Sequence, residues 1–304
     1  MRESGQRLKA IVLGSGAGGG VPQWNCRCKI CSLARAGDPR VRPRLQVGVA
    51  VSADQDHWMV LGASPDLRQQ ILQTQALAPR DGLRHSPIAQ VVLLNADIDA
   101  IAGLLALREG APFDLIAPAP ILDVLRANPV FDVLDPALVR RVTAVPGQTL
   151  ECGHGLSLTL LAMPGKVPLY LEDRAAAQPA AGPTYAALIA CGGRRLLMAP
   201  ACAAFTPAVT DLLREADVVL FDGTLFTDDE MIAAGLGHKT GRRMGHVSMS
   251  GADGSLARLA DLPARRIFIH INNTNPVLIE DSPERRAAEA AGFEIAHDGM
   301  EICP

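Results

Sequence analysis

The sequence has little of what nucleic-acid-binding and membrane proteins need. Aromatic residues make up only 4% of the chain and the formal net charge is −3, so it offers neither a platform for stacking bases nor a basic stripe for phosphates. It also lacks a run of about 18 apolar residues, the length of a membrane span, and an apolar signal-peptide core after Met1. We therefore expect a cytoplasmic protein that binds a small molecule, with no nucleic acid and no membrane among its partners.

The chain has enough apolar residues to form a large core. Its 304 residues are 48% hydrophobic, which suffices for one large α/β domain or for two smaller ones. No stretch is typical of a linker between two domains. We therefore expect residues 1–304 to form a single domain.

Three closely spaced cysteines follow a glycine-rich stretch at 14–20. Cys26, Cys28 and Cys31 have the spacing C-x-C-x-x-C, and the hydrophilic Arg27 and Lys29 between them argue against three unrelated buried side chains. Such spacing brings three thiolates onto one centre, and in a cytosolic protein it favours zinc over a disulfide. The sequence thus predicts a structural Zn²⁺ site that still needs a fourth ligand.

The same glycines fit a second pattern, the dinucleotide-binding G-x-G-x-x-G, at Gly14, Gly16 and Gly19. That motif requires a helix to begin at the glycines, so that its N-terminus can hold a pyrophosphate. Here Val21 and Pro22 follow, and then the cysteines. The Gly-Lys-Ser/Thr of a P-loop is absent as well, so the metal interpretation is favoured over both phosphate-binding ones.

Strand and helix patterns alternate along the chain. Ser64 is most simply the N-cap of a helix that continues to about residue 76, and further helices are predicted at 101–108, 121–127 and 136–142. The Pro- and Ala-rich stretch 164–183 is predicted to be a long loop, either a lid or disordered. Apolar runs predict strands at 9–13, 45–51, 57–61, 88–94, 156–163, 185–191, 195–199, 217–221 and 266–271. Along the chain, strands are followed by helices, and this order then occurs a second time. It predicts two sheets packed face to face, with helices outside.

Polar residues occur where three of these apolar strands end. Asp97 or Asp99, Asp222 and His270 each lie at or just past such an end, where active sites of α/β sheets gather. If the strands are neighbours, two carboxylates and one imidazole converge, a set that suits Fe(II) or Mn(II) and tolerates Zn(II). Each residue also has a structural interpretation: Asp99 as an acid in the first turn of a helix, Asp222 as the cap of the following turn, and His270 as a hydrogen-bonded histidine of the core.

Several sequence blocks together resemble the family of coenzyme PQQ synthesis protein B (PqqB), which has the metallo-β-lactamase fold. They cover essentially the whole chain and include residues 14–28, Ala-Ser-Pro-Asp at 63–66, 104–109, Phe-Asp-Gly-Thr-Leu at 221–225, Thr-Gly-Arg-Arg-Met-Gly-His at 240–246, and His-Ile-Asn-Asn-Thr-Asn-Pro at 270–276. The resemblance implies an αββα sandwich of two mixed sheets flanked by helices. It also implies a structural zinc at the cysteines, a second metal in the groove of the fold, and a role in making pyrroloquinoline quinone (PQQ).

The groove motif of the wider fold, H-x-H-x-D-H, is altered here. Asn95, Asp97, Asp99 and Ala100 occupy its four ligand positions, which argues against a hydrolase with two groove metals. PqqB relatives usually carry histidine where Ala100 stands, and a methyl group cannot ligate. Either Asp99, Asp222 and His270 hold one metal together with water, with help from Asp97, or the site is weak and the protein is not a catalyst.

The resemblance also suggests roles for residues near the groove. Related phosphodiesterases place a fourth zinc ligand three residues after the groove histidine, and Asn273 stands there. We expect Asn273 beside the zinc and His270 in the groove, with the reverse assignment left open. The substrate-facing residues are expected to be His246, as acid, base or orienting donor, together with Arg242, Arg243, Asn272 and Ser64; for the basic residues the alternative is a solvated loop.

The function implied by the resemblance is an iron-dependent hydroxylation in PQQ biosynthesis. An oxidoreductase with Fe²⁺ in the groove would hydroxylate the tyrosine moiety of a dipeptide-like glutamate–tyrosine precursor. The alternative is a binding or carrier protein for PQQ or its precursor, with a transport role. Other expected partners are PQQ-pathway proteins and a second copy in a homodimer. The remaining histidines and cysteines are expected to be structural, namely His57, His85, His154, His297, Cys152, Cys191, Cys202 and Cys303.

Overall fold

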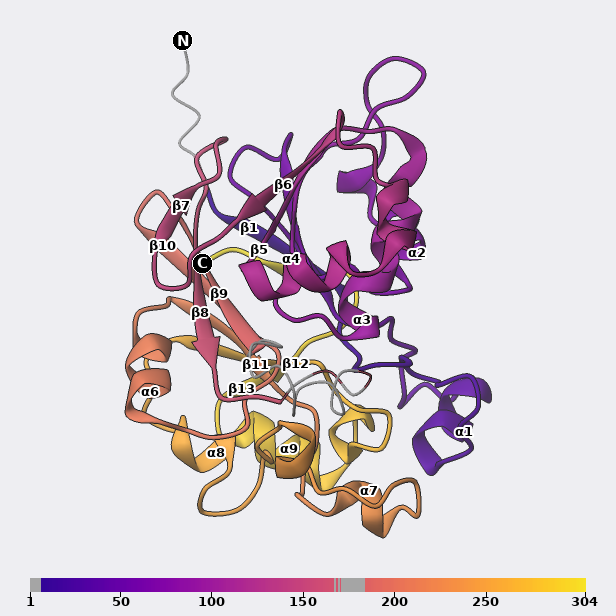
Figure 1. The fold of residues 1–304 in the computed structure, drawn as a ribbon. Coiled ribbons are helices and arrows are strands. Elements are labelled where there is room, and N and C mark those ends of the chain that lie inside the picture. Colours follow the sequence, from indigo (N-terminus) through magenta and orange to yellow (C-terminus); the bar gives the residue numbers. More distant parts are fainter. Residues whose placement is uncertain (1–6, 167, 169, 171–183) are drawn as a thin grey trace.

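Two β-sheets lie face to face between helices in the computed structural model, which describes residues 7–166, 168, 170 and 184–304 (Figure 1). Both sheets mix parallel and antiparallel pairs. This is the predicted αββα sandwich. Most of the predicted loop 164–183 lies outside the described residues.

The first sheet comes mainly from the N-terminal half of the chain. Strands β2 and β3 pair in antiparallel orientation, and β3 to β6 run parallel to one another. In spatial order its strands are β14 (Glu301–Ile302), β1 (Lys9–Gly14), β2 (Gly48–Ser52), β3 (Trp58–Leu61), β4 (Ile88–Val92), β5 (Phe113–Ala117) and β6 (Val139–Thr143).

The second sheet comes from the C-terminal half. Its strands β10 to β13 are parallel, while β7, β8 and β9 form an antiparallel meander at the other edge. In spatial order its strands are β13 (Phe293–Ile295), β12 (Arg265–Ile269), β11 (Val218–Asp222), β10 (Arg194–Ala199), β9 (Thr184–Cys191), β8 (Ser157–Met163) and β7 (Thr149–Glu151).

Both faces of the central strands are buried, which explains their continuous apolar sequence. In β11 the side chains of Val218 and Leu220 join the core that contains the first sheet, whereas Val219 and Phe221 pack with the outer helices. Alternating side chains point to opposite faces of a strand, so a strand covered on both sides is apolar throughout. The apolar runs that predicted strands are therefore explained by two layers of packing.

Helices cover the outer face of each sheet. Figure 1 shows α2, α3 and α4 beside the first sheet, and α6, α8 and α9 beside the second. The α-helices are α1 (Lys29–Arg35), α2 (Leu67–Gln73), α3 (Ile98–Ile101), α4 (Ala119–Arg126), α6 (Pro207–Arg214), α7 (Glu230–Ala233), α8 (Ser255–Arg258) and α9 (Pro283–Ala290). The 3-10 helices are η1 (Gln75–Leu77), η2 (Ala102–Glu109), η3 (Pro129–Val133), η5 (Arg242–Met244) and η6 (Pro276–Leu278). None of the helices in the described ranges is long and apolar enough to cross a membrane.

Two local predictions were wrong. Residues 136–142 were predicted to be helical, but 139–142 belong to β6, which in the described part of the chain is an edge strand beside β5 and is partly exposed, so its sequence is not continuously apolar. Ser64 does not cap α2 with its side chain. The N-cap residue is Asp66, and the buried Ser64 hydroxyl has no hydrogen-bond partner among the residues that the structure describes.

The parallel strands end at one edge, where the polar residues gather. Asp222 is the last residue of β11, His270 follows β12, and Asp97 and Asp99 follow β4. β4 belongs to the first sheet and β11 and β12 to the second, and Asp99 and His270 approach each other from the two sheets. All four residues thus lie at or just past the ends of strands.

Candidate functional site

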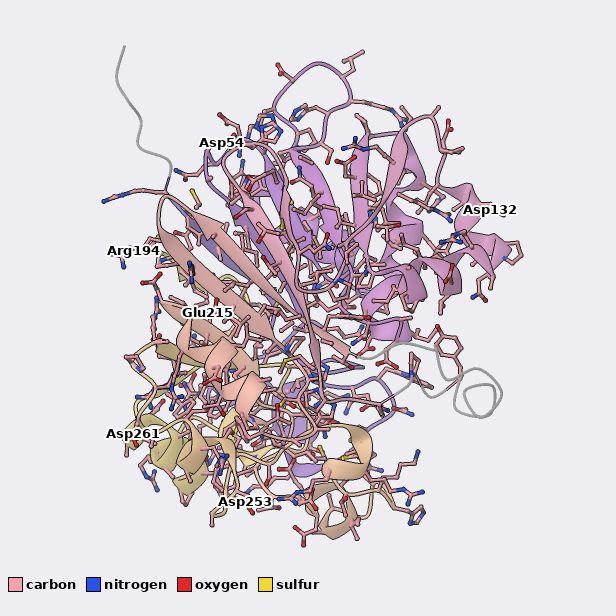
Figure 2. All side chains as sticks on the ribbon, turned by 60° about the vertical axis from the view of Figure 1, so that its left-hand side comes forward. Asp54, Asp132, Arg194, Glu215, Asp253 and Asp261 are labelled. Atoms are coloured by element: carbon pink, nitrogen blue, oxygen red, sulfur yellow. The ribbon has the colours of Figure 1, made fainter. Side chains whose placement is uncertain are left out.

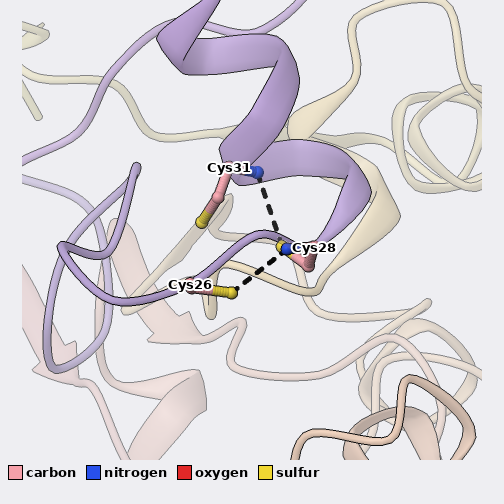
Figure 3. A group of neighbouring side chains, drawn as sticks. All are labelled: Cys26, Cys28 and Cys31. Atoms are coloured by element: carbon pink, nitrogen blue, oxygen red, sulfur yellow. Dashed lines mark hydrogen bonds between the residues drawn. The ribbon is translucent and has the colours of Figure 1, made fainter.

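The three clustered cysteines form a compact sulfur site at the start of α1. Each pair of Sγ atoms lies within 4.8 Å, and two backbone N–H groups of the cluster point at sulfurs, Cys28 N at Cys26 and Cys31 N at Cys28, both at 3.4 Å (Figure 3). Burial raises the pKa of Cys28 to about 12, so three thiolates can share this site only around a cation. Three clustered sulfurs with N–H donors fit a tetrahedral Zn²⁺.

Asn273 lies against this cluster, as expected from the sequence. Its Nδ2 is 3.2 Å from the Sγ of Cys31, and its backbone oxygen accepts from the Cys28 thiol at 3.4 Å. On the other side, the guanidinium of Arg35 donates to the backbone oxygens of Gln23 and Cys26. The loop that carries the sulfurs is therefore fastened from both sides.

A second candidate site is a cavity of about 190 Å³ at the shared edge of the sheets. Its lining combines acidic, basic and apolar groups. Among the residues that line it are Asp97, Asp99, Ala100, Lys166, His246 and His270. A mixed lining of this kind can hold a small polar molecule and place it beside titratable groups.

Thr224 connects the histidines of this cavity with Asp222. Its hydroxyl is 2.7 Å from Oδ1 of Asp222, 2.8 Å from Nδ1 of His270 and 3.0 Å from Nδ1 of His246. Asp222 is fully buried, and its Oδ2 lies 2.9 Å from Nδ1 of His246. One buried carboxylate and one hydroxyl therefore fix the orientation of both rings.

These hydrogen bonds also assign the tautomers of the rings. If the Thr224 hydroxyl donates to Asp222, it can only accept from Nδ1 of His270; the carboxylate of Asp222 likewise accepts from Nδ1 of His246. In both neutral rings Nε2 is then left without a proton. An imidazole whose other nitrogen is held by a carboxylate or hydroxyl is typical of metal ligands.

Asp99 approaches the cluster from the first sheet. Its Oδ2 lies 3.8 Å from Nε2 of His270. Burial disfavours the charged ring of His270, but Asp99 and the other nearby carboxylates together raise its pKa above the usual value. Burial and the like charge of Asp99 raise the pKa of Asp97. The cavity thus concentrates acidic groups that a cation would stabilise.

The donor set fits a divalent cation. The ligand atoms of Asp222, His246 and His270 lie within 4.8 Å of one another, and Asp99 adds a carboxylate oxygen next to His270. Two imidazoles with a carboxylate suit iron(II), and also tolerate zinc. Ala100 lines the cavity with a methyl group, so that position supplies no ligand.

The glycine-rich stretch forms part of the same site. A Cβ on Gly18 would lie 2.9 Å from Oδ2 of Asp99, so the backbone approaches this carboxylate more closely than any side chain allows. Gly16 makes bridge contacts with Gln46 of the first half and with Ile271 of the second. The glycine-rich stretch thus connects the cavity with the cysteine cluster that follows it in the sequence.

Four residues predicted to face a substrate do not line this cavity. Arg242 and Arg243 are exposed on η5, and only the next three residues reach the cavity wall. Asn272 donates to Thr274, and the backbone of Ser64 packs against Gly103, which buries its side chain. His246 does line the cavity, but within the donor cluster rather than apart from it.

Sequence reasoning missed Thr224 and Lys166. Thr224 lies two residues after Asp222, and a hydroxyl just past a buried acidic strand end was a usable signal. Lys166 lies at the start of the predicted loop and lines the cavity. Nothing in its sequence surroundings distinguishes it from a solvent-exposed lysine.

Known proteins resemble this chain over nearly its whole length. The model of the Beta-lactamase superfamily domain matches residues 57–271. Coenzyme PQQ synthesis protein B from Methylorubrum extorquens is 54% identical over 297 residues, which cover 97% of this chain and 99% of that protein. The protein of the same name from Gluconacetobacter diazotrophicus is 50% identical over 306 residues, with the same two coverages.

Solved structures show the same fold. The crystal structure of Zn²⁺-bound PqqB from Methylobacterium extorquens has a TM-score of 0.93 at 53% identity and covers 97% of this chain and 99% of that one. A diphosphatase of the PhnP family has a TM-score of 0.68 at 22% identity, covering 98% of this chain and 97% of that one. At 22% identity, the similarity to the diphosphatase shows a shared fold only.

Proposed function

Since this chain belongs to the coenzyme PQQ synthesis protein B family, within the β-lactamase superfamily, its place is in PQQ biosynthesis, and we propose that it hydroxylates a tyrosine-containing precursor. The observation that carries the proposal is the cluster of Asp222, His246 and His270 at the cavity, with Asp99 beside it. Two histidines and one carboxylate with open positions are typical of non-haem iron oxygenases.

Three residues that line the cavity, His246, His270 and Asp99, would hold the iron. The buried carboxylate of Asp222, which does not line the cavity, would hold the ring of His246 through its Nδ1. When bound, iron would supply the activation of O₂ that ring hydroxylation requires. One oxygen atom would enter the ring as a hydroxyl group, and the other would leave as water with two electrons from a reductant. Thr224 would keep both rings oriented through their Nδ1 atoms.

Other groups of the cavity would bind the precursor and move protons. Lys166 would pair with a carboxylate of the glutamate–tyrosine precursor, the role that the sequence had suggested for Arg242 and Arg243. Asp97, which lines the cavity beside Asp99, would accept the proton that the ring loses as it becomes aromatic again. The methyl group of Ala100 leaves space in the same cavity.

The cysteine cluster would have a separate, structural role. Cys26, Cys28 and Cys31 would bind Zn²⁺, with Asn273 as partner, and would fix the loop that carries Gly18 against Asp99. The zinc in the crystal structure of a 53% identical relative supports metal binding by this family. Structural zinc holds a short loop that has little core of its own.

One feature favours a second function, that of a carrier for PQQ or its precursor. Ala100 lines the cavity without a donor atom, which weakens metal binding and leaves room for a bound molecule. In that case Lys166 would hold a carboxylate of the cargo and no chemistry would follow.

Oxygen uptake separates the two functions. Purified protein is loaded anaerobically with Fe(II), mixed with a glutamate–tyrosine precursor and a reductant, and exposed to O₂. The proposal predicts precursor-dependent oxygen consumption that stops in His270→Ala. Tight binding of PQQ or the precursor by iron-free protein, with no oxygen consumed after iron is added, would favour the carrier.

A further inference from the structure

A cluster of three metal-binding side chains lies far from the cavity described above. Asp54 and His57 belong to the turn between β2 and β3, and His154 belongs to the turn between β7 and β8. The cavity lies past the carboxyl ends of β3 and β4, whereas this turn precedes β3. Figure 2 shows Asp54 at the opposite end of the molecule from Asp253 and Asp261.

The two imidazoles share one carboxylate oxygen. Oδ2 of Asp54 lies 2.8 Å from Nδ1 of His57 and 3.8 Å from Nδ1 of His154. The two rings stack with their centroids 3.6 Å apart and an angle of 16° between their planes. A hydrogen bond to Asp54 explains the position of His57. It does not explain the position of His154, whose Nδ1 faces the same oxygen at a distance too long for a hydrogen bond.

The spacing of these atoms suits a small cation. Tetrahedral Zn²⁺ with bonds of about 2.0–2.1 Å places its ligand atoms about 3.3–3.4 Å apart. The observed separations of 2.8 and 3.8 Å from Oδ2 of Asp54 lie on either side of that value, and the ligand atoms of all three residues lie within 4.8 Å of one another. Side-chain exposures of 29%, 46% and 40% for Asp54, His57 and His154 let an ion enter.

The carboxylate is held in position by its other oxygen. Oδ1 of Asp54 accepts from the hydroxyl of Ser52 and from the backbone N–H groups of Asp56 and His57. Oδ2 is therefore left to face the two histidines. A ligand fixed by hydrogen bonds outside the metal site is typical of built metal centres.

The backbone also holds His154 in an uncommon conformation. Its φ is 51°, between Gly153 with φ 72° and Gly155 with φ 80°, so three consecutive residues have positive φ. A left-handed conformation costs energy for histidine, and such strain is common at ligand sites. The neighbouring Cys152 is tied to the first sheet, because Nε2 of Gln90 donates to its backbone oxygen at 2.9 Å.

We propose that Asp54, His57 and His154 form a further metal site, for Zn²⁺ or another divalent ion that prefers imidazole, with water completing its coordination. The ion would join a turn of the first sheet to a turn of the second. The sequence alone led us to treat both histidines as structural. The site is independent of the cavity and of the cysteine cluster.

Counting bound zinc in matched variants of the full chain tests this proposal. The variants are His57→Gln and His154→Asn, the second because asparagine tolerates positive φ and preserves the turn. His238→Gln removes an exposed histidine elsewhere and serves as the control. Each protein is dialysed to equilibrium against micromolar Zn²⁺, its zinc per chain is measured, and its fold is checked by circular dichroism.

The proposal predicts one zinc fewer per chain in each site variant than in the wild type and the control. It also predicts that added Zn²⁺ raises the melting temperature less in the site variants than in the control. Equal zinc content in all four folded proteins would overturn it. If a variant fails to fold, Asp54→Asn replaces it, with the same two outcomes.

Discussion

Oδ2 of Asp99, from the first sheet, lies 3.8 Å from Nε2 of His270, from the second sheet. Asp99 follows β4 and His270 follows β12, so this pair joins the carboxyl edges of the two sheets. The interaction is compatible with a shared cation, because two ligands of one ion lie about 3–4 Å apart at bond lengths near 2.1 Å. The cavity therefore depends on both halves of the chain.

Replacing Asp99 by alanine should weaken metal binding in the cavity. The variant loses one oxygen donor and one negative charge beside His270, so we expect a fall in iron affinity of at least about tenfold. Anaerobic Fe(II) titration measures it. Circular dichroism should show the wild-type fold, and a folded Asp99→Ala protein with unchanged affinity would remove Asp99 from the site.

Adding one methyl group at Gly18 should disturb the same carboxylate. Its Cβ would lie 2.9 Å from Oδ2 of Asp99, so the end of this side chain must move away. We expect Gly18→Ala to lower both iron affinity and thermal stability. Gly237→Ala is the matched control, because its new Cβ meets only ordinary contacts at 3.5 Å. Identical behaviour of the two variants would contradict the close approach.

Replacing Cys28 by serine should remove the structural zinc. The thiol of Cys28 contacts both Cys31 and Asn273, and a serine hydroxyl is a poor zinc ligand. We expect Cys28→Ser to bind one zinc fewer per chain and to melt at a lower temperature than the wild type. A chelator should not lower the melting temperature of the variant further by removing zinc from the cysteine site. Cys303→Ser, which changes an exposed thiol, should keep the zinc. Unchanged zinc content in Cys28→Ser would exclude this site.

Stability should fall as pH rises through neutrality because of Glu230. Burial raises the pKa of this carboxyl to about 7 from 4.5, so the folded state holds a proton that the unfolded state has lost. The stability it contributes is complete below pH 4.5 and is lost as pH rises through about 7. Between pH 5 and 8 we expect the wild type to lose roughly 1–3 kcal/mol relative to Glu230→Gln.

Urea unfolding at several pH values measures this difference. Asp261→Asn, which changes an exposed carboxyl that makes no hydrogen bond with Glu230, is the control and should follow the wild type. Parallel pH curves for the wild type and Glu230→Gln would mean that Glu230 titrates normally in the folded protein.

The sequence predicted the positions of the strand ends but not the directions of the side chains around them. Long apolar runs mark buried strands, because both faces of those strands must be covered, and so Asp99, Asp222 and His270 could be assigned to strand ends. The cysteine spacing was equally informative, since three thiolates so close in sequence are necessarily close in space. Both inferences need only local chain geometry.

Other features of the site depend on distant contacts. Arg242 and Arg243 precede a residue that reaches the cavity, yet the turn of η5 leaves both exposed. Thr224 gains its role from two histidines that follow it by 22 and 46 positions. The sequence predicted a helix where β6 lies, because a partly exposed strand lacks the continuous apolar run of a buried one.

The most direct test of the proposed function is the fate of the oxygen atoms of O₂. Iron-loaded protein is given the glutamate–tyrosine precursor, a reductant and ¹⁸O₂, and the product is analysed by mass spectrometry. The account predicts one ¹⁸O atom in each hydroxylated product molecule, and no such product from the iron-loaded His270→Ala protein. Unmodified precursor, or a product whose new oxygen comes from water, would contradict it.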